Sequence, residues 1–218
     1  MRQNYIQNME TLGEEIASAI THGVGAALSI AGLTLLLVFA AQVEDSWRIV
    51  SVSIYGGALV FLYLASTLYH AIQHLATKQV FHILDHVGIF LLIAGTYTPI
   101  LLIKMRDLQG WTFFGLIWGL ALVGASLKAF FTGRFVKVST FTYVAMGWSS
   151  LFLAKSMVAT LGLGGIAWLV AGGLSYSLGV IPFLWERLPF NHAIWHLFVI
   201  GGSACHFVVI LHYVLPTG

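Results

Sequence analysis

His192 and His196 are the residues of this sequence with the clearest capacity for chemistry. Residues four positions apart lie on one face of a helix, so both imidazoles could bind one metal ion. Zinc favours nitrogen ligands in tetrahedral geometry, and a catalytic zinc site combines three protein ligands with one open position. Packed histidines can have the same spacing, so the pair alone leaves both interpretations open.

Three residues elsewhere in the chain could complete such a site. His70 is a candidate third ligand, although a histidine near a membrane boundary can equally be packed or interfacial. Ser66 lies one turn before His70 and would face the same centre, unless its hydroxyl only bonds the backbone of its own helix. Asp85 could accept a proton from water at the metal or orient a ligand, but it could also pair with Lys78 or cap a helix.

The composition places these residues in a membrane. Of the 218 residues, 59% are hydrophobic and 8% are charged, against roughly 25% charged residues in a soluble domain. The apolar residues form long runs, and about 20 helical residues cross a hydrocarbon core. We therefore predict an all-α fold, a bundle of seven transmembrane helices. The net charge of +2 gives no indication of nucleic-acid binding, and the lone Cys205 excludes an internal disulfide.

The predicted bundle is one domain, residues 16–218, preceded by a short N-terminal tail, residues 1–15. We expect its helices at residues 16–42, 49–75, 79–103, 111–131, 138–159, 166–185 and 191–215. A cytoplasmic N-terminus places six basic residues on the cytoplasmic side and four on the other, which favours that orientation. The C-terminus is then external, and the chain is a multi-pass protein of the inner (plasma) membrane.

Antiparallel crossings bring the candidate residues to one depth. His22, His70, Asp85, His192 and His196 all fall within roughly 10 Å of the same membrane boundary, because they lie at helix ends that share one face. Ionisable groups inside membrane spans are costly and usually face the bundle interior in pairs or functional sites. We therefore predict a metal site in this layer, with His70, His192 and His196 as ligands.

The other ionisable residues are expected to have structural roles. Glu15 and His22 are seven residues apart on one helical face and could form a polar pair. His74 and His82 lie close to the boundary and are expected to be interfacial. His206 is about 21 Å from His192 along the helix, too far to share the metal, so a buried polar contact is expected there.

Six motifs follow one another along the chain: Glu14-Glu15-Ile16-Ala17, Thr21-His22-Gly23, Ser66-Thr67-Leu68-Tyr69-His70, Leu84-Asp85-His86, Ala94-Gly95-Thr96-Tyr97-Thr98-Pro99 and Asn191-His192-Ala193-Ile194-Trp195-His196. This ordered set covers nearly the whole chain. It resembles the bacterial haemolysin III family, the bacterial branch of the progestin and adipoQ receptor (PAQR) superfamily.

The resemblance implies seven helices, a cytoplasmic N-terminus and zinc held by three histidines near the cytoplasmic side. Carried over by motif, the ligands are again His70, His192 and His196, with the family aspartate at Asp85 and the family serine at Ser66. The resemblance also implies hydrolysis of lipids, with ceramide-type amide cleavage as the pattern. The sequence departs from the superfamily pattern in two ways. Position 18 is serine where asparagine is expected, and there is no sizeable N-terminal domain, so recognition of a protein hormone is not expected.

These observations favour a zinc-dependent hydrolase of a lipid amide or ester, acting in membrane lipid homeostasis. Asp85 would serve as general base, Ser66 would donate to the developing oxyanion, and the lipid would enter laterally from the bilayer. A non-catalytic sensor or regulator with structural zinc is the main alternative. A cytolytic pore would need a polar stripe along several helices, and a transporter would need ionisable groups near the midplane. The sequence does not indicate an oligomeric state.

Overall fold

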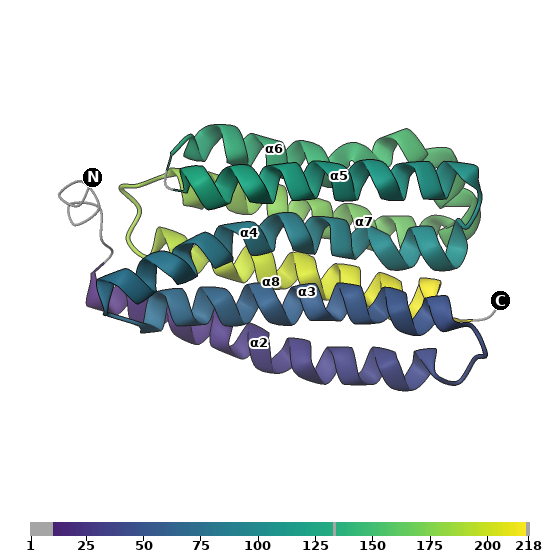
Figure 1. Ribbon diagram of the computed structural model, residues 1–218, viewed down its shortest axis with the longest axis horizontal. Helices are drawn as coiled ribbons and strands as arrows, with labels where there is room; N and C mark the ends of the chain where they lie inside the picture. The colour runs from purple at the N-terminus through teal and green to yellow at the C-terminus, as the bar shows by residue number, and fades with distance from the viewer. Residues whose placement is uncertain (1–10, 133, 217–218) are drawn as a thin grey trace.

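The computed structural model describes residues 11–132 and 134–216, and within these ranges all regular secondary structure is helical. The helices lie roughly parallel to one another in an elongated bundle (Figure 1). They are α2 (Leu12–Ala40), α3 (Ser46–Ala71), α4 (Leu75–Pro99), α5 (Leu108–Phe131), α6 (Val136–Trp148), α7 (Ala154–Leu184) and α8 (Asn191–Val209). Helices α4 and α8 each continue into a five-residue π-helical turn, Ile100–Lys104 and Ile210–Val214.

The prediction of an all-α membrane protein is confirmed. Six helical stretches among the described residues are long and apolar enough to cross a membrane. Large apolar side chains such as Leu12, Phe130 and Phe152 are more than 60% exposed. Such exposure suits the outer surface of a bundle that contacts lipid rather than water.

The longest apolar stretch, Val136–Leu184, has 49 residues and folds back on itself. Gly162 interrupts it with φ 66° and ψ 174°, a conformation that favours glycine. A hydrogen bond joins the two halves: Trp148 Nε1, before this glycine, donates to Ser177 Oγ, after it, at 2.9 Å. The two halves therefore lie side by side, as expected for two separate helices over residues 138–159 and 166–185.

The first half of this stretch is not one regular α-helix, so the prediction of a single helix over 138–159 is wrong. Residues Ser149–Leu153 form a 3-10 segment between α6 and α7. The Tyr97 hydroxyl donates to the Gly147 carbonyl (2.6 Å) and accepts from the Ser150 backbone N–H (2.9 Å). A tyrosine from α4 thus satisfies backbone groups at the break, which a membrane interior requires.

Helix ends near the candidate site also differ from the prediction. Helix α2 begins at Leu12 rather than Ile16, because Thr11 and Glu14 form a reciprocal capping box. Helix α3 ends at Ala71, and α4 begins at Leu75 because the His74 side chain caps it by accepting from the Thr77 backbone N–H. His70 is therefore in the last turn of α3.

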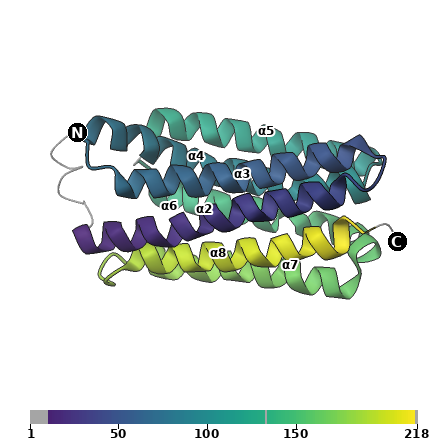
Figure 2. The ribbon, with the colours of Figure 1, turned by 90° about the horizontal axis from the view of Figure 1, so that it is seen from below.

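Helices α2, α3 and α8 form the part of the bundle that carries His22, His70, His192 and His196. Seen from below, α2 lies between α3 and α8 (Figure 2). The close approach of α2 to α3 depends on Gly25, where a Cβ atom would lie 2.7 Å from the Tyr63 ring. Helices α2 and α8 run in the same direction, so both begin at the same end of the bundle (Figure 1).

Candidate metal centre

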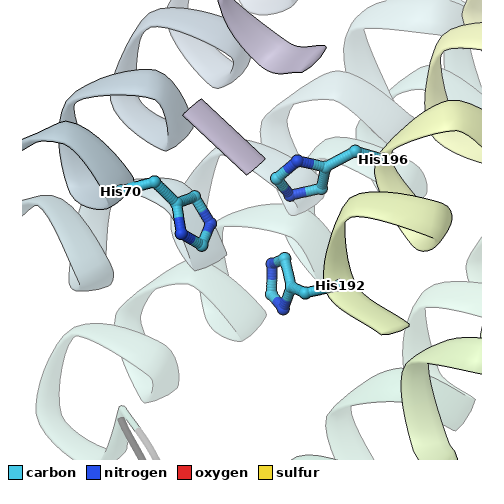
Figure 3. Close-up of side chains that lie close together, drawn as sticks. All are labelled: His70, His192 and His196. Carbon is cyan, nitrogen blue, oxygen red and sulfur yellow. The ribbon is translucent and has the colours of Figure 1, made fainter. Parts of the chain in front are cut away.

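Three histidines from two helices point toward one another at the end of the bundle where α2 and α8 begin (Figure 3). His70 comes from α3, and His192 and His196 come from successive turns of α8. One ring nitrogen of each lies within 4.8 Å of the others. Tetrahedral zinc with bonds of about 2.0–2.1 Å brings ligand nitrogens to about 3.4 Å, so small rotations of the rings would complete such a site.

Acceptor groups on α2 fix the orientation of two of these rings. Glu15 Oε2 lies 2.8 Å from His70 Nδ1, and the Ser18 carbonyl oxygen lies 3.2 Å from His196 Nδ1. Carboxylate and carbonyl oxygens only accept, so each Nδ1 donates and each Nε2 is presented to the centre. Metal-binding histidines are held in this way by outer carboxylates and carbonyls, so the residues fit a metal.

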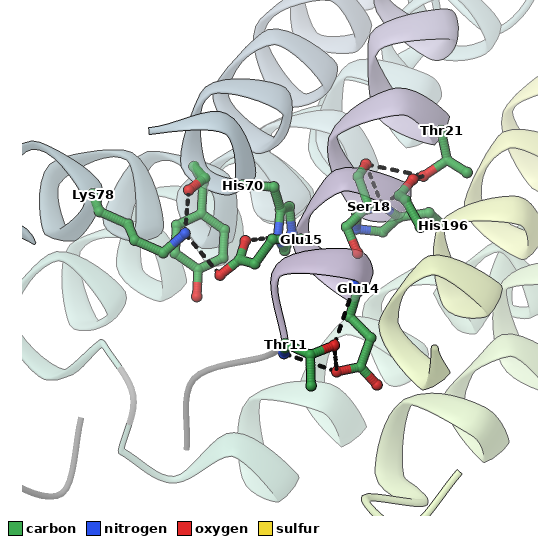
Figure 4. A network of polar contacts seen from close by, with 10 residues as sticks. Thr11, Glu14, Glu15, Ser18, Thr21, His70, Lys78 and His196 are labelled. Carbon is green, nitrogen blue, oxygen red and sulfur yellow. Dashed lines mark hydrogen bonds and ion pairs between the residues drawn. The ribbon is translucent and has the colours of Figure 1, made fainter. Parts of the chain in front are cut away.

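Glu15 also pairs with a lysine, as Figure 4 shows. Lys78 Nζ lies 2.8 Å from Glu15 Oε1 and donates to the Tyr69 carbonyl at 2.8 Å. Both side chains are buried. The suggested pairs Glu15–His22 and Asp85–Lys78 are therefore wrong, because Glu15 lies between His70 and Lys78 and bonds both.

His22 instead packs directly against the site. Its ring stacks on that of His196, with centroids 3.3 Å apart and planes at 11°. The Tyr63 ring contacts it edge-on at 4.9 Å. Neither ring nitrogen of His22 hydrogen-bonds to a described residue. His22 therefore acts as a flat, buried surface that restricts the rotation of His196.

The predicted serine and aspartate are buried beside the histidines. Ser66 is fully buried one turn before His70, and its hydroxyl makes no hydrogen bond of ordinary length with the described residues. The Asp85 carboxyl is buried within range of an interaction with this hydroxyl. Neither side chain is fixed by a hydrogen bond of ordinary length to a described residue, and their catalytic roles stay a prediction.

A largely apolar cavity of about 220 Å³ extends from the histidines into the bundle. Asp85, His192 and His196 line it at one end, and Tyr97, Leu169 and His206 line it farther along. Leu151 and Val170, on the α6–α7 side of the cavity, are 64% and 40% exposed. These two residues therefore line the cavity and are also exposed on the outside of the bundle. The cavity thus extends from the candidate metal centre to a wall that borders the surroundings of the bundle.

The remaining histidines only partly follow the prediction. His206 contacts the Leu169 carbonyl (3.4 Å) and is not among the three clustered histidines, as expected. His74 is exposed, in agreement with an interfacial position. His82, in contrast, is partly buried and stacks on Tyr69. His86 lies 3.9 Å from the Asp85 carboxylate and lines the same cavity.

The beginning of α8 is attached to α2 through the glutamate next to Glu15. Glu14 Oε1 accepts a hydrogen bond from the Phe190 backbone N–H at 3.0 Å. Phe190 precedes α8 and has φ 56°, an unusual value for a residue other than glycine. This contact positions the first turn of α8 and therefore His192.

Comparison of the sequence with known proteins identifies the family of the chain. Residues 11–207 match the profile of a family described as haemolysin-III related. The chain belongs to the haemolysin III family. It is 49% identical to Hemolysin-3 of Bacillus cereus over 217 residues, covering 100% of this chain and 99% of that protein. It is 48% identical to the Hemolysin-3 homolog of Bacillus subtilis over 205 residues, covering 94% and 96%.

This haemolysin III protein also resembles a eukaryotic protein. It is 33% identical to the human Monocyte to macrophage differentiation factor over 209 residues, which cover 93% of this chain and 85% of that protein. That relative is of the PAQR type, so the predicted membership is confirmed for both the family and the superfamily.

Sequence reasoning missed two groups at the centre of this haemolysin III protein. Glu15 and Ser18, together with His22, lie three and four residues apart and therefore share one face of α2. This spacing was a usable signal that the whole face points inward. It did not indicate that Glu15 would reach His70, because that depends on how α2 is rotated against α3.

Proposed function

We propose that this protein is a zinc-dependent hydrolase of a lipid amide or ester. The observation that carries the proposal is the three-histidine cluster at one end of an apolar cavity, with the Asp85 carboxyl in the cavity wall. Three imidazoles suit zinc and leave a fourth position for a reactant. An apolar cavity with few polar groups suits an acyl chain whose polar end lies at the histidines.

His70, His192 and His196 would hold the zinc ion. When bound, zinc would supply a Lewis acid that polarises the substrate carbonyl and acidifies water. The Asp85 carboxylate would take the proton from the attacking water and deliver it to the departing amine or alcohol. The Ser66 hydroxyl would donate a hydrogen bond to the oxyanion. The products are a fatty acid and the amine or alcohol, which together contain the atoms of the lipid and one water.

Residues around the cavity would bind and orient the lipid. The apolar lining would exclude bulk water from the acyl chain, and an opening between α6 and α7 would admit the chain from the bilayer. Exposed Leu151 and Val170 support this route, since both line the cavity as well. The same largely apolar lining speaks against an ion-conducting path.

The first test is the zinc content of the detergent-purified protein, beside His192→Ala and His196→Ala variants. We expect about one zinc per chain in the wild type and a large loss in each folded variant. Asp85→Asn should keep its zinc and lose hydrolysis of long-chain amides and esters by at least about a hundredfold.

Each result has a distinct meaning for the proposal. Wild-type protein purified without chelators and free of zinc would remove the hydrolase. Bound zinc with no turnover of any lipid amide or ester would leave a sensor or regulator with structural zinc as the better interpretation.

We further propose that the chain crosses the membrane seven times, because the stretch Val136–Leu184 turns back at Gly162. A cytoplasmic N-terminus and an external C-terminus complete this topology, in the inner (plasma) membrane of the cell. The metal centre would then lie near the cytoplasmic boundary.

A further inference from the structure

Lys128 is a buried lysine without a partner in the part of the chain that the structure describes. It lies in the last turn of α5 and is 4% exposed. Its Nζ makes no hydrogen bond with any residue in the described ranges. Lysine is almost never buried unless it is paired, because removing an ammonium group from water is costly. The buried lysine of the metal centre, Lys78, has both a carboxylate and a carbonyl partner, so the two sites differ in kind.

The electrostatic interactions of Lys128 are with histidines, one of which, His86, also lies 3.9 Å from the Asp85 carboxylate. His82 and His86, on successive turns of α4, both lie within electrostatic range of the Lys128 ammonium group. Their rings contact each other edge-on, with centroids 4.5 Å apart. His86 Nδ1 lies 2.9 Å from the His82 carbonyl and therefore donates to it. Among the described residues, no ion pair or hydrogen bond joins a carboxylate to Lys128.

An ammonium group beside two imidazoles can be neutralised by a phosphate group, which offers several strong acceptor oxygens. Lysine binds phosphate as a point charge, and a phosphate group would supply the negative charge that Lys128 lacks. Lys128 therefore lacks an anionic partner among the described residues, and an anion from elsewhere would complete the ion pair.

The position of Lys128 matches the layer of lipid headgroups. The connection that follows α5 carries the exposed Arg134, and the exposed Lys137 lies in the first turn of α6. Basic residues just beyond a spanning helix are typical of a membrane–water interface. Lys128 lies about one turn inside this interface, roughly 5 Å deeper, where a lipid phosphate can reach it.

We propose that Lys128, with His82 and His86 beside it, binds a phosphate group, and that an anionic phospholipid carries this group. The site is separate from the three clustered histidines and needs neither zinc nor catalysis. It shares the end of the bundle with them, since His86 also lines the cavity that His192 and His196 line. A phospholipid held at Lys128 would border the cavity with its glycerol and acyl chains.

The test compares the full-length wild type with Lys128→Met and Lys137→Met in nanodiscs of phosphatidylcholine. Phosphatidic acid is added in one series, diacylglycerol with the same acyl chains in a second, and inorganic phosphate in a third. The readouts are the thermal unfolding midpoint and the dissociation constant by native mass spectrometry. Lys137→Met removes an exposed positive charge at the same interface and is the matched control.

We expect phosphatidic acid to raise the unfolding midpoint of the wild type and of Lys137→Met, with no shift from diacylglycerol. Lys128→Met should lose the shift and bind phosphatidic acid at least about tenfold more weakly, because a buried charged contact is removed. In phosphatidylcholine alone, Lys128→Met should be at least as stable as the wild type, since its unpaired charge is gone.

Equal responses to phosphatidic acid in Lys128→Met and the wild type would overturn the site. An equal shift from inorganic phosphate at the same concentration would overturn the assignment to a lipid. Zinc content, measured in the same samples, tests the metal centre separately, so the failure of one proposal is distinguishable from the failure of the other.

Discussion

At the scale of single residues, the chemistry of the candidate metal centre depends on Glu15 as much as on the histidines. Its two carboxylate oxygens are divided between His70 Nδ1 and Lys78 Nζ, each at 2.8 Å. The carboxylate therefore fixes the tautomer and direction of one imidazole, while the lysine neutralises its charge. Such an arrangement increases the basicity of the ligand and reduces the entropy lost when a metal binds.

Replacing this carboxylate should weaken metal binding without removing a ligand. We expect Glu15→Gln to reduce zinc affinity about 10- to 100-fold, because the outer partner of His70 loses its charge. Competition with a zinc chelator measures the change. Glu44→Gln is the control, since Glu44 is an exposed glutamate between α2 and α3, at the end of α2 far from the histidines. Equal zinc affinities for Glu15→Gln and wild type would show that Glu15 has no part in holding the metal.

The three histidines could be predicted from sequence, whereas their outer partners could not. Helical periodicity places His192 and His196 on one face, and antiparallel crossings bring His70 to the same depth. Neither argument specifies how α2 is rotated about its axis, and this rotation directs Glu15 to His70 rather than to His22. Side-chain pairing across helices is a property of packing, which a single sequence does not encode in its spacing.

At the scale of helices, Gly162 allows the stretch Val136–Leu184 to fold back. Its φ of 66° and ψ of 174° lie in a region that is essentially confined to glycine. We expect Gly162→Ala to destabilise the protein by about 1–3 kcal/mol, measured as a fall in the thermal unfolding midpoint in detergent. Gly57→Ala is the control, because Gly57 is helical and a Cβ atom there meets nothing within 4 Å. A fall as large in Gly57→Ala would exclude backbone strain as the cause.

The positions of most helices could be predicted because long apolar runs leave little choice of structure in a membrane. Their ends and irregularities could not. The capping box at Thr11 lengthens α2 by about one turn, and the Tyr97 hydroxyl permits the 3-10 segment Ser149–Leu153. A hydroxyl from one helix that satisfies the backbone of another leaves no periodic pattern in the sequence.

At the scale of the whole molecule, the proposed seven crossings predict which loops face which side of the membrane. In a Cys205→Ser background, we expect Gln42→Cys and Leu163→Cys to react with a membrane-impermeant maleimide added to intact cells. Gln73→Cys and Glu186→Cys should react only after the cells are opened. Gln42, Leu163, Gln73 and Glu186 are all exposed in the fold, so protection would reflect the membrane. Labelling of Glu186→Cys in intact cells would contradict seven crossings with a cytoplasmic N-terminus.

The pairing of Glu15 also bears on how the protein is made. The contact between Thr21 and His196 joins residues 175 positions apart, whereas Glu15 and His70 are only 55 apart. At about 5–20 residues per second, the ribosome needs roughly 10–35 seconds to bridge the longer separation. For about two-thirds of that interval, once residue 78 has been made, the nascent chain contains both His70 and Lys78, so the acidic group of its first helix has partners inside the bilayer. Synthesis of α8 then supplies two of the three imidazoles, so the proposed metal site can form only after α8 has been made.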